Sequence, residues 1–164
     1  MKTLLLIRHA HASWQHAGLQ DHERPLTAEG IASAESMGMT LKEKTGTPDL
    51  VISSPAVRAL DTAIIMARAL DYPRHEILIE SKVYHGQTDD LHNLIAGLPN
   101  DQDMVMITGH NPTITQLANS FMPQKEDYMP NTGVACIQFD AKAWEEIALA
   151  PAYTLFVLRS GNGG

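Results

Sequence analysis

Apolar positions along the chain alternate between two patterns. Short runs rich in apolar residues predict strands at residues 2–7, 49–53, 76–79, 103–108, 134–139 and 153–158, and the first is typical of a strand buried on both faces, as in a parallel sheet. Between the first five runs, apolar residues recur every three or four positions, as they do on one face of a helix. The residues expected to begin these helices are Thr27, Ser54-Pro55, Asp89 or Asp90, and Asn111-Pro112.

Strands that alternate with helices indicate an α/β protein. We expect a three-layer sandwich with a mostly parallel central sheet, formed by residues 1–160 as a single domain, and a flexible tail at residues 161–164. The stretch from residue 79 to residue 104 has room for one helix only. The sequence therefore predicts no large helical insertion over the sheet.

Composition and charge narrow the classes of partner. The formal net charge is −7, and nucleic-acid binding needs a basic surface. The apolar run at residues 4–7 is too short for a membrane span or a signal peptide. The lone Cys136 cannot form an internal disulfide. We therefore expect a cytoplasmic protein that binds neither nucleic acid nor membranes, in which any anion site is a local basic pocket.

Basic side chains follow three of the expected strands. Arg8 and His9 follow the first strand, Arg58 lies in the first turn of the helix after the second, and His110 follows the fourth. Ligands of open α/β sheets bind beyond the carboxyl ends of the strands. Two arginines and two histidines are thus expected on one rim of the sheet.

The position of Arg58 favours an anion at this rim. A cation in the first turn of a helix opposes the helix dipole, at a cost of roughly 0.3–1 kcal/mol. An anion bound by the helix amides and by the guanidinium would account for it. A surface arginine lying along the helix is the alternative, and it stays open at this point.

His9 has the features of a nucleophile. Two nearby arginines lower the pKa of an imidazole, because they repel its protonated form, and a neutral imidazole has a lone pair that can attack an electrophile. A backbone carbonyl is expected to bind its other nitrogen. The alternative is a buried, hydrogen-bonded histidine without a chemical role.

Four blocks of sequence resemble the histidine phosphatase superfamily, which has the phosphoglycerate mutase-like fold. They are Leu6-Ile7-Arg8-His9-Ala10, residues 21–30 with the segment Arg24-Pro25-Leu26-Thr27, residues 53–63 with Ser54-Pro55 and Arg58, and Gly109-His110-Asn111-Pro112. The last block, the segment Arg24-Pro25-Leu26-Thr27 and the shortness of the chain make it most similar to the SixA-type branch. That branch is associated with phosphohistidine on signalling proteins of the phosphorelay type.

The resemblance implies that His9 becomes phosphorylated and that Arg8, Arg58 and His110 hold the phosphate. Ser13, Asn111 and His85 are further candidates for substrate binding, whereas His11 is expected to face solvent.

Many members of the superfamily use a carboxylic acid after the third strand to protonate an alcohol leaving group. Glu80 is the nearest carboxylate here, and we expect it at the strand end or on the surface. A missing acid is tolerable for a phosphoramidate, because imidazole, with a pKa of about 6.5, leaves more easily than an alkoxide. The expected activity is a phosphohistidine phosphatase acting on a protein such as a histidine phosphotransfer domain, without a cofactor.

Three other functions stay open. The chain could hydrolyse small phosphate esters, or bind phosphate without catalysis. It could also be a metal-dependent hydrolase using His9, His11 and His110. Metal sites usually include carboxylates, and the sequence places none on the rim beside these histidines. Two arginines would also repel a divalent cation, so no metal is expected.

Overall fold

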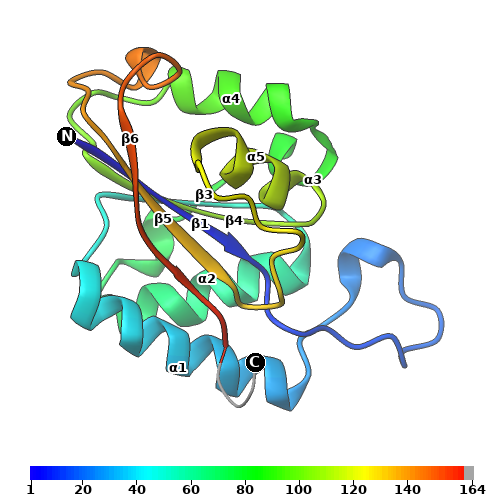
Figure 1. The fold of residues 1–164 in the computed structure, drawn as a ribbon. Helices are drawn as coiled ribbons and strands as arrows, with labels where there is room; N and C mark the ends of the chain where they lie inside the picture. The colour runs from blue at the N-terminus through cyan, green and yellow to red at the C-terminus, as the bar shows by residue number, and fades with distance from the viewer. Residues whose placement is uncertain (161–164) are drawn as a thin grey trace.

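The computed structural model describes residues 1–160 and is built on one six-stranded sheet (Figure 1). The strand order is β3-β2-β4-β1-β5-β6. Their bounds are Lys2–Arg8 for β1, Leu50–Ser53 for β2, Leu78–Ile79 for β3, Met104–Gly109 for β4, Val134–Phe139 for β5 and Ala152–Leu158 for β6. β3, β2, β4 and β1 are parallel, whereas β5 is antiparallel to both β1 and β6. The mostly parallel sheet is confirmed. The expected flexible tail, residues 161–164, lies outside the described residues.

Helices cover both faces of the sheet. The α-helices are α1 (Ala28–Thr45), α2 (Val57–Ala69), α3 (Lys82–His85), α4 (Thr88–Ala96) and α5 (Thr113–Phe121). Single 3-10 turns are formed by η1 (Asp21–Glu23), η2 (Arg74–Glu76) and η3 (Trp144–Glu146). The expectation of one helix between residues 79 and 104 is wrong, because the one-turn α3 precedes α4. No helix of residues 1–160 is long and apolar enough to cross a membrane.

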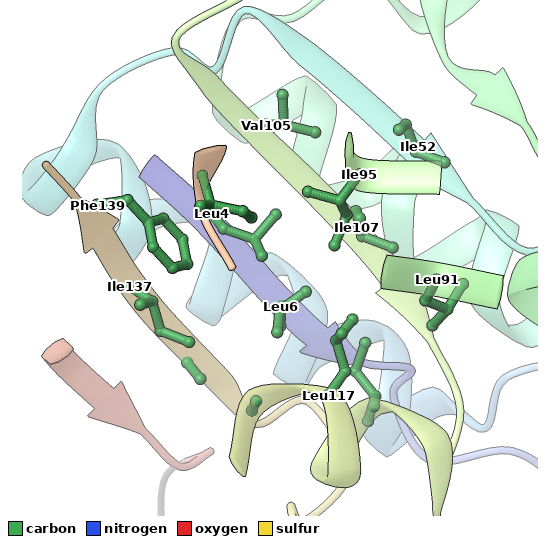
Figure 2. Close-up of a cluster of buried hydrophobic side chains, with 14 of the residues drawn as sticks. Leu4, Leu6, Ile52, Leu91, Ile95, Val105, Ile107, Leu117, Ile137 and Phe139 are labelled. Atoms are coloured by element: carbon green, nitrogen blue, oxygen red, sulfur yellow. The ribbon is translucent and has the colours of Figure 1, made fainter. Parts of the chain in front are cut away.

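Successive residues of the buried strands point to opposite faces, and each face has its own core. Leu4 and Leu6 of β1 pack on the side of α4 and α5, with Leu91, Ile95 and Leu117 (Figure 2). The intervening strand residues pack on the side of α1 and α2, which supply Met37, Leu41, Ala63 and Met66. This alternation gives the expected three-layer sandwich.

Three of the four expected helix starts differ from the structure. The hydroxyl of Thr27 caps α1 as predicted, accepting the N–H of Gly30 at 3.0 Å. In contrast, α2 begins at Val57, α4 is preceded by Gln87, and α5 is preceded by Pro112. Ser54 lies before α2, and its hydroxyl accepts the N–H of Ala56. Asn111 lies before α5, and its amide donates to the backbone oxygen of Met129. Asp90 lies inside α4 and accepts the N–H of Gln87 at 2.8 Å.

Strands β1 and β4 lie side by side, and the chain leaves them toward opposite faces. β1 leads to α1 on one face, and β4 leads to α5 on the other. Their carboxyl ends pair in register, with Arg8 beside Gly109. Such a divergence opens a crevice beyond the strand ends, so residues that follow β1 and β4 meet there.

Candidate functional site

A cavity of about 330 Å³ lies at the carboxyl ends of β1 and β4. It is lined by Arg8, His9, His11, Ala12, Trp14, Asp21, Arg24, Arg58, His110, Asn111 and Asn131. The structure therefore brings five of the seven predicted site residues to one place. The other two, Ser13 and His85, lie outside this lining.

The ring of His9 is fixed in one tautomer. Its Nδ1 lies 2.7 Å from the backbone oxygen of Ala10, and the ring is only 7% exposed. A carbonyl oxygen can only accept, so Nδ1 bears the hydrogen and Nε2 keeps its lone pair. The expected backbone partner is confirmed.

The environment of His9 favours the neutral ring. Burial is the largest cause and, with the charges of Arg58, Arg8 and Arg24, it lowers the pKa of His9 to about 4, whereas the hydrogen bond to Ala10 acts in the opposite direction. The sequence alone indicated the arginines as the cause of a lowered pKa. They contribute, but loss of water around the ring is the larger effect.

His110 faces His9 from the end of β4. The two ring centroids are 5.1 Å apart, and Nε2 of His110 lies 2.8 Å from the hydroxyl oxygen of Ser54. Burial, and then the nearby His9 and Arg58, lower the pKa of His110 to about 3. Within residues 1–160 its Nδ1 is buried without a hydrogen-bond partner. Both imidazoles are thus uncharged at neutral pH.

Arg58 is bound to an acidic residue. Its side chain is buried, and it donates one hydrogen bond to the backbone oxygen of Asp21 at 2.8 Å and another to the Asp21 carboxylate at 2.9 Å. The expectation that no carboxylate lies beside the histidines is therefore wrong. Asp21 belongs to the irregular segment of residues 10–26, whose path cannot be deduced from hydrophobic periodicity.

Three donors hold the Asp21 carboxylate. Besides Arg58, the hydroxyl of Tyr84 donates to it at 2.6 Å and Arg24 donates at 3.3 Å. The hydrogen bond from Tyr84 is the largest cause that lowers the pKa of Asp21, with Arg58 and Arg24 adding to it against the effect of burial. Asp21 is consequently a carboxylate near neutral pH. Glu80 follows β3, half-buried, and does not line the cavity.

The loop before β5 positions Arg8. Arg8 donates to the backbone oxygen of Met129 at 3.1 Å, and its guanidinium lies 4.7 Å from the ring centroid of Tyr128. The N–H of Thr132 contacts the backbone oxygens of Arg8 and His9 at 3.1 and 3.2 Å. Thr132 adopts a φ of 63° to do so, a conformation that is rare for a β-branched residue.

The remaining predicted residues take supporting positions. Asn111 donates to the backbone oxygen of Met129 at 2.7 Å. The backbone oxygen of Ser13 accepts from Arg24, and the ring of His85 packs on Tyr84 at 4.5 Å. His11 is exposed as expected, yet it also borders the cavity.

Four polar or aromatic residues of the cavity lining and one residue behind it were not predicted from the sequence. Asp21, Arg24, Trp14 and Asn131 border the cavity, and Tyr84 binds Asp21 from outside its lining. Arg24 and Asp21 lay within a block of the family resemblance, which was the available signal. Among residues 1–160, no group of three or more His, Cys, Asp or Glu side chains is arranged to hold a metal ion.

Comparison with known proteins identifies a family. Residues 4–94 match the model of the histidine phosphatase superfamily (branch 1). An uncharacterized chloroplastic protein of Arabidopsis thaliana is 30% identical over 171 residues, covering 99% of this chain and 74% of the plant protein. A 2,3-bisphosphoglycerate-dependent phosphoglycerate mutase of Bifidobacterium longum is 42% identical over 72 residues, covering 42% of this chain and 28% of the mutase.

Solved structures extend the likeness to the whole fold. A candidate phosphohistidine phosphatase SixA from Nakamurella multipartitia superposes with a TM-score of 0.84 at 25% identity, over 97% of this chain and 96% of that one. A candidate SixA from Agrobacterium tumefaciens gives 0.82 at 26% identity, over 98% and 99%.

Proposed function

Because this chain belongs to the histidine phosphatase superfamily, we propose that it is a phosphatase in which His9 receives the phosphoryl group. One observation carries the proposal. His9 is neutral, its Nδ1 is bound to Ala10, and its ring lies in a cavity with Arg8 and Arg58. A free lone pair beside two guanidinium groups is suited to attack a phosphorus atom.

The reaction has two displacements. In the first, Nε2 of His9 forms a bond to phosphorus while the bond from phosphorus to the leaving group breaks. Arg8 and Arg58 stabilise the charge on the equatorial oxygens, and His110, which lines the same cavity, helps to hold the phosphoryl group. In the second, a water oxygen attacks phosphorus and the P–N bond to His9 breaks. The electron pair of that bond returns to Nε2, and the water protons remain on the inorganic phosphate that leaves.

The proposed substrate is phosphohistidine on a protein. The only helices between β3 and β4 are α3 and α4, of four and nine residues, so residues 1–160 form no large helical roof over the cavity. The Asp21 carboxylate is held ionised by Tyr84 and Arg58, which makes it a poor acid for an alkoxide leaving group. The ring of phosphohistidine needs less assistance, because with its second nitrogen protonated it departs as neutral imidazole. The similarity to the two candidate SixA phosphohistidine phosphatases supports this substrate.

Small phosphate esters are the second candidate. Two observations favour them. Phosphoglycerate mutases are among the relatives, and the cavity contains a carboxylate, Asp21, the type of group that protonates an alcohol leaving group. A panel of a phosphohistidine protein, phosphoramidate and phenyl phosphate separates the two. Under the first proposal, kcat/KM is highest for the phosphohistidine protein; the reverse order would move the assignment to esters.

Trapping the intermediate tests the role of His9. Rapid mixing with labelled substrate, followed by a quench, should give protein-bound phosphate that is acid-labile and base-stable, located on His9 by peptide mapping. His9→Ala should give neither turnover nor label, while His75→Ala, at an exposed histidine outside the cavity lining, should give both. Label on any other residue would refute the assignment.

A further inference from the structure

Trp14 lies at the cavity with most of its surface free. It is 78% exposed, although it is among the residues that line the cavity. Isolated exposed apolar side chains are common on proteins. An indole at the edge of a cavity lined by arginines is different, because the part of a substrate that extends out of the cavity can contact it.

One face of the indole is already occupied. The guanidinium of Arg24 lies 3.3 Å from the centre of the Trp14 ring, and the Arg24 side chain is only 11% exposed. Arg24 is itself fixed, because it donates to the backbone oxygen of Ser13 at 3.1 Å and to Asp21 at 3.3 Å. The stack therefore holds the indole at the cavity edge, and the exposed area belongs to the rest of the ring.

The arrangement combines a cation with an aromatic surface. Arg24 and Arg58 provide positive charge within the cavity, which suits the phosphoryl group. The free part of the indole provides a flat apolar surface, which suits a planar ring. A substrate with a phosphoryl group attached directly to an aromatic ring would contact both at once.

We propose that the free face of Trp14 stacks on the ring that bears the phosphoryl group, so that this enzyme selects phosphoryl groups bound to planar aromatic rings such as imidazole. The inference rests on the proposed function and assigns recognition of the substrate ring to Trp14. Trp14 then contributes to specificity through direct contact with the leaving group, in addition to its contact with Arg24.

Two P–N compounds test the contact, because they differ in the ring. N-phosphoimidazole has an aromatic leaving group, whereas phosphoramidate has ammonia. We expect Trp14→Ala to lower kcat/KM for N-phosphoimidazole about threefold to tenfold, which corresponds to the usual interaction free energy of two stacked aromatic rings. For phosphoramidate, kcat/KM should change less than about twofold, because ammonia has no ring to stack. Trp14→Phe, which keeps an aromatic ring, should retain most of the wild-type kcat/KM for N-phosphoimidazole. Comparing each variant with the wild type removes the difference in leaving-group chemistry.

Inhibition by inorganic phosphate separates this role from a purely structural one. Phosphate has no ring, so its inhibition constant should be unchanged in Trp14→Ala. Equal losses for both substrates together with weaker phosphate inhibition would show that Trp14 acts only by holding Arg24, and would overturn the proposal. Leu19→Ala, in the same loop but outside the cavity lining, is the control for disturbance of the loop and should behave as the wild type.

The remaining outcomes are also decisive. If Trp14→Ala hydrolyses both compounds as well as the wild type, the indole does not contact the leaving group and the inference is wrong, while the proposed function stands. If the wild type hydrolyses neither compound and forms no phosphohistidine on His9, the proposed function is wrong and the inference falls with it.

Discussion

Arg58 and Asp21 are joined twice, by hydrogen bonds of 2.8 Å to the backbone oxygen and 2.9 Å to the carboxylate. The carboxylate therefore lies where an anionic ligand would meet this guanidinium. A phosphoryl group entering the cavity must share Arg58 with Asp21 or displace it. The pair orients Arg58 in the free protein and also places a negative charge beside the proposed phosphate position.

Replacing Asp21 by Asn should strengthen the binding of phosphate. The change removes one negative charge from the cavity and retains a side chain of similar shape. Charges a few ångströms apart near a protein surface interact by a few kcal/mol before screening, so we expect the inhibition constant of inorganic phosphate to fall about threefold to tenfold. Asp140→Asn, at an exposed site outside the cavity lining, changes the net charge equally and should leave the constant unchanged. Weaker inhibition in Asp21→Asn would mean that orienting Arg58 matters more than the charge.

Gly30 determines the position of the segment that holds Trp14 and Asp21. A Cβ atom at this residue would overlap the backbone oxygen of His11. Gly30→Ala should therefore displace His11, lower the free energy of unfolding by about 2 kcal/mol and reduce kcat/KM. Urea denaturation and steady-state kinetics measure the two effects.

Gly97→Ala is the matched control for Gly30→Ala. An added Cβ there would meet its nearest neighbour at 3.6 Å, an ordinary contact. Its stability should stay within about 0.5 kcal/mol of the wild type. A Gly30→Ala variant as stable and as active as Gly97→Ala would show that the His11 segment yields freely.

The buried strands could be predicted from the sequence because their apolar runs are unambiguous. The strand ends then placed Arg8 and His110 on one rim, since parallel strands end at the same edge. The order of the strands and the antiparallel direction of β5 could not be predicted, because they depend on long-range pairing. Helix starts were less certain, since Ser54 and Asn111 resemble caps but bind elsewhere.

The positions of Asp21 and Trp14 at the cavity were not predictable for a different reason. Asp21 and Trp14 lie in an irregular segment without periodicity, and its course depends on contacts with residues far away in sequence. Arg58 and Tyr84, 37 and 63 residues from Asp21, provide two of those contacts. The position after the third strand therefore indicates Glu80, whereas the carboxylate at the cavity is Asp21.

Ser54 should affect catalysis through His110. Its hydroxyl oxygen lies 2.8 Å from Nε2 of His110, and both side chains are largely removed from water. Ser54→Ala leaves this nitrogen without its partner and the ring free to turn, so we expect kcat/KM to fall about tenfold, since small misplacements of a catalytic group are costly. The pH profile of kcat/KM should shift as well, because the ring loses a hydrogen bond.

Ser53→Ala is the matched control for Ser54→Ala. Ser53 is equally buried and donates to the backbone oxygen of Ser54 at 2.8 Å. Its loss should cost roughly 1 kcal/mol of stability and leave the pH profile in place. Equal activity losses in the two variants would assign the effect to the fold alone.

The depressed pKa of His9 should make the stability of the chain depend on pH. It is about 4 in the folded state against an ordinary value of 6.5, so between these values the unfolded chain binds more protons. The free energy of unfolding therefore falls as the pH is lowered from 6.5 to 4, by roughly 3 kcal/mol at most from this ring. Urea titrations at a series of pH values should show a smaller slope for His9→Asn than for the wild type, and an unaltered slope for His75→Asn, at an exposed histidine. Equal slopes in His9→Asn and the wild type would show that folding leaves the proton affinity of His9 unchanged.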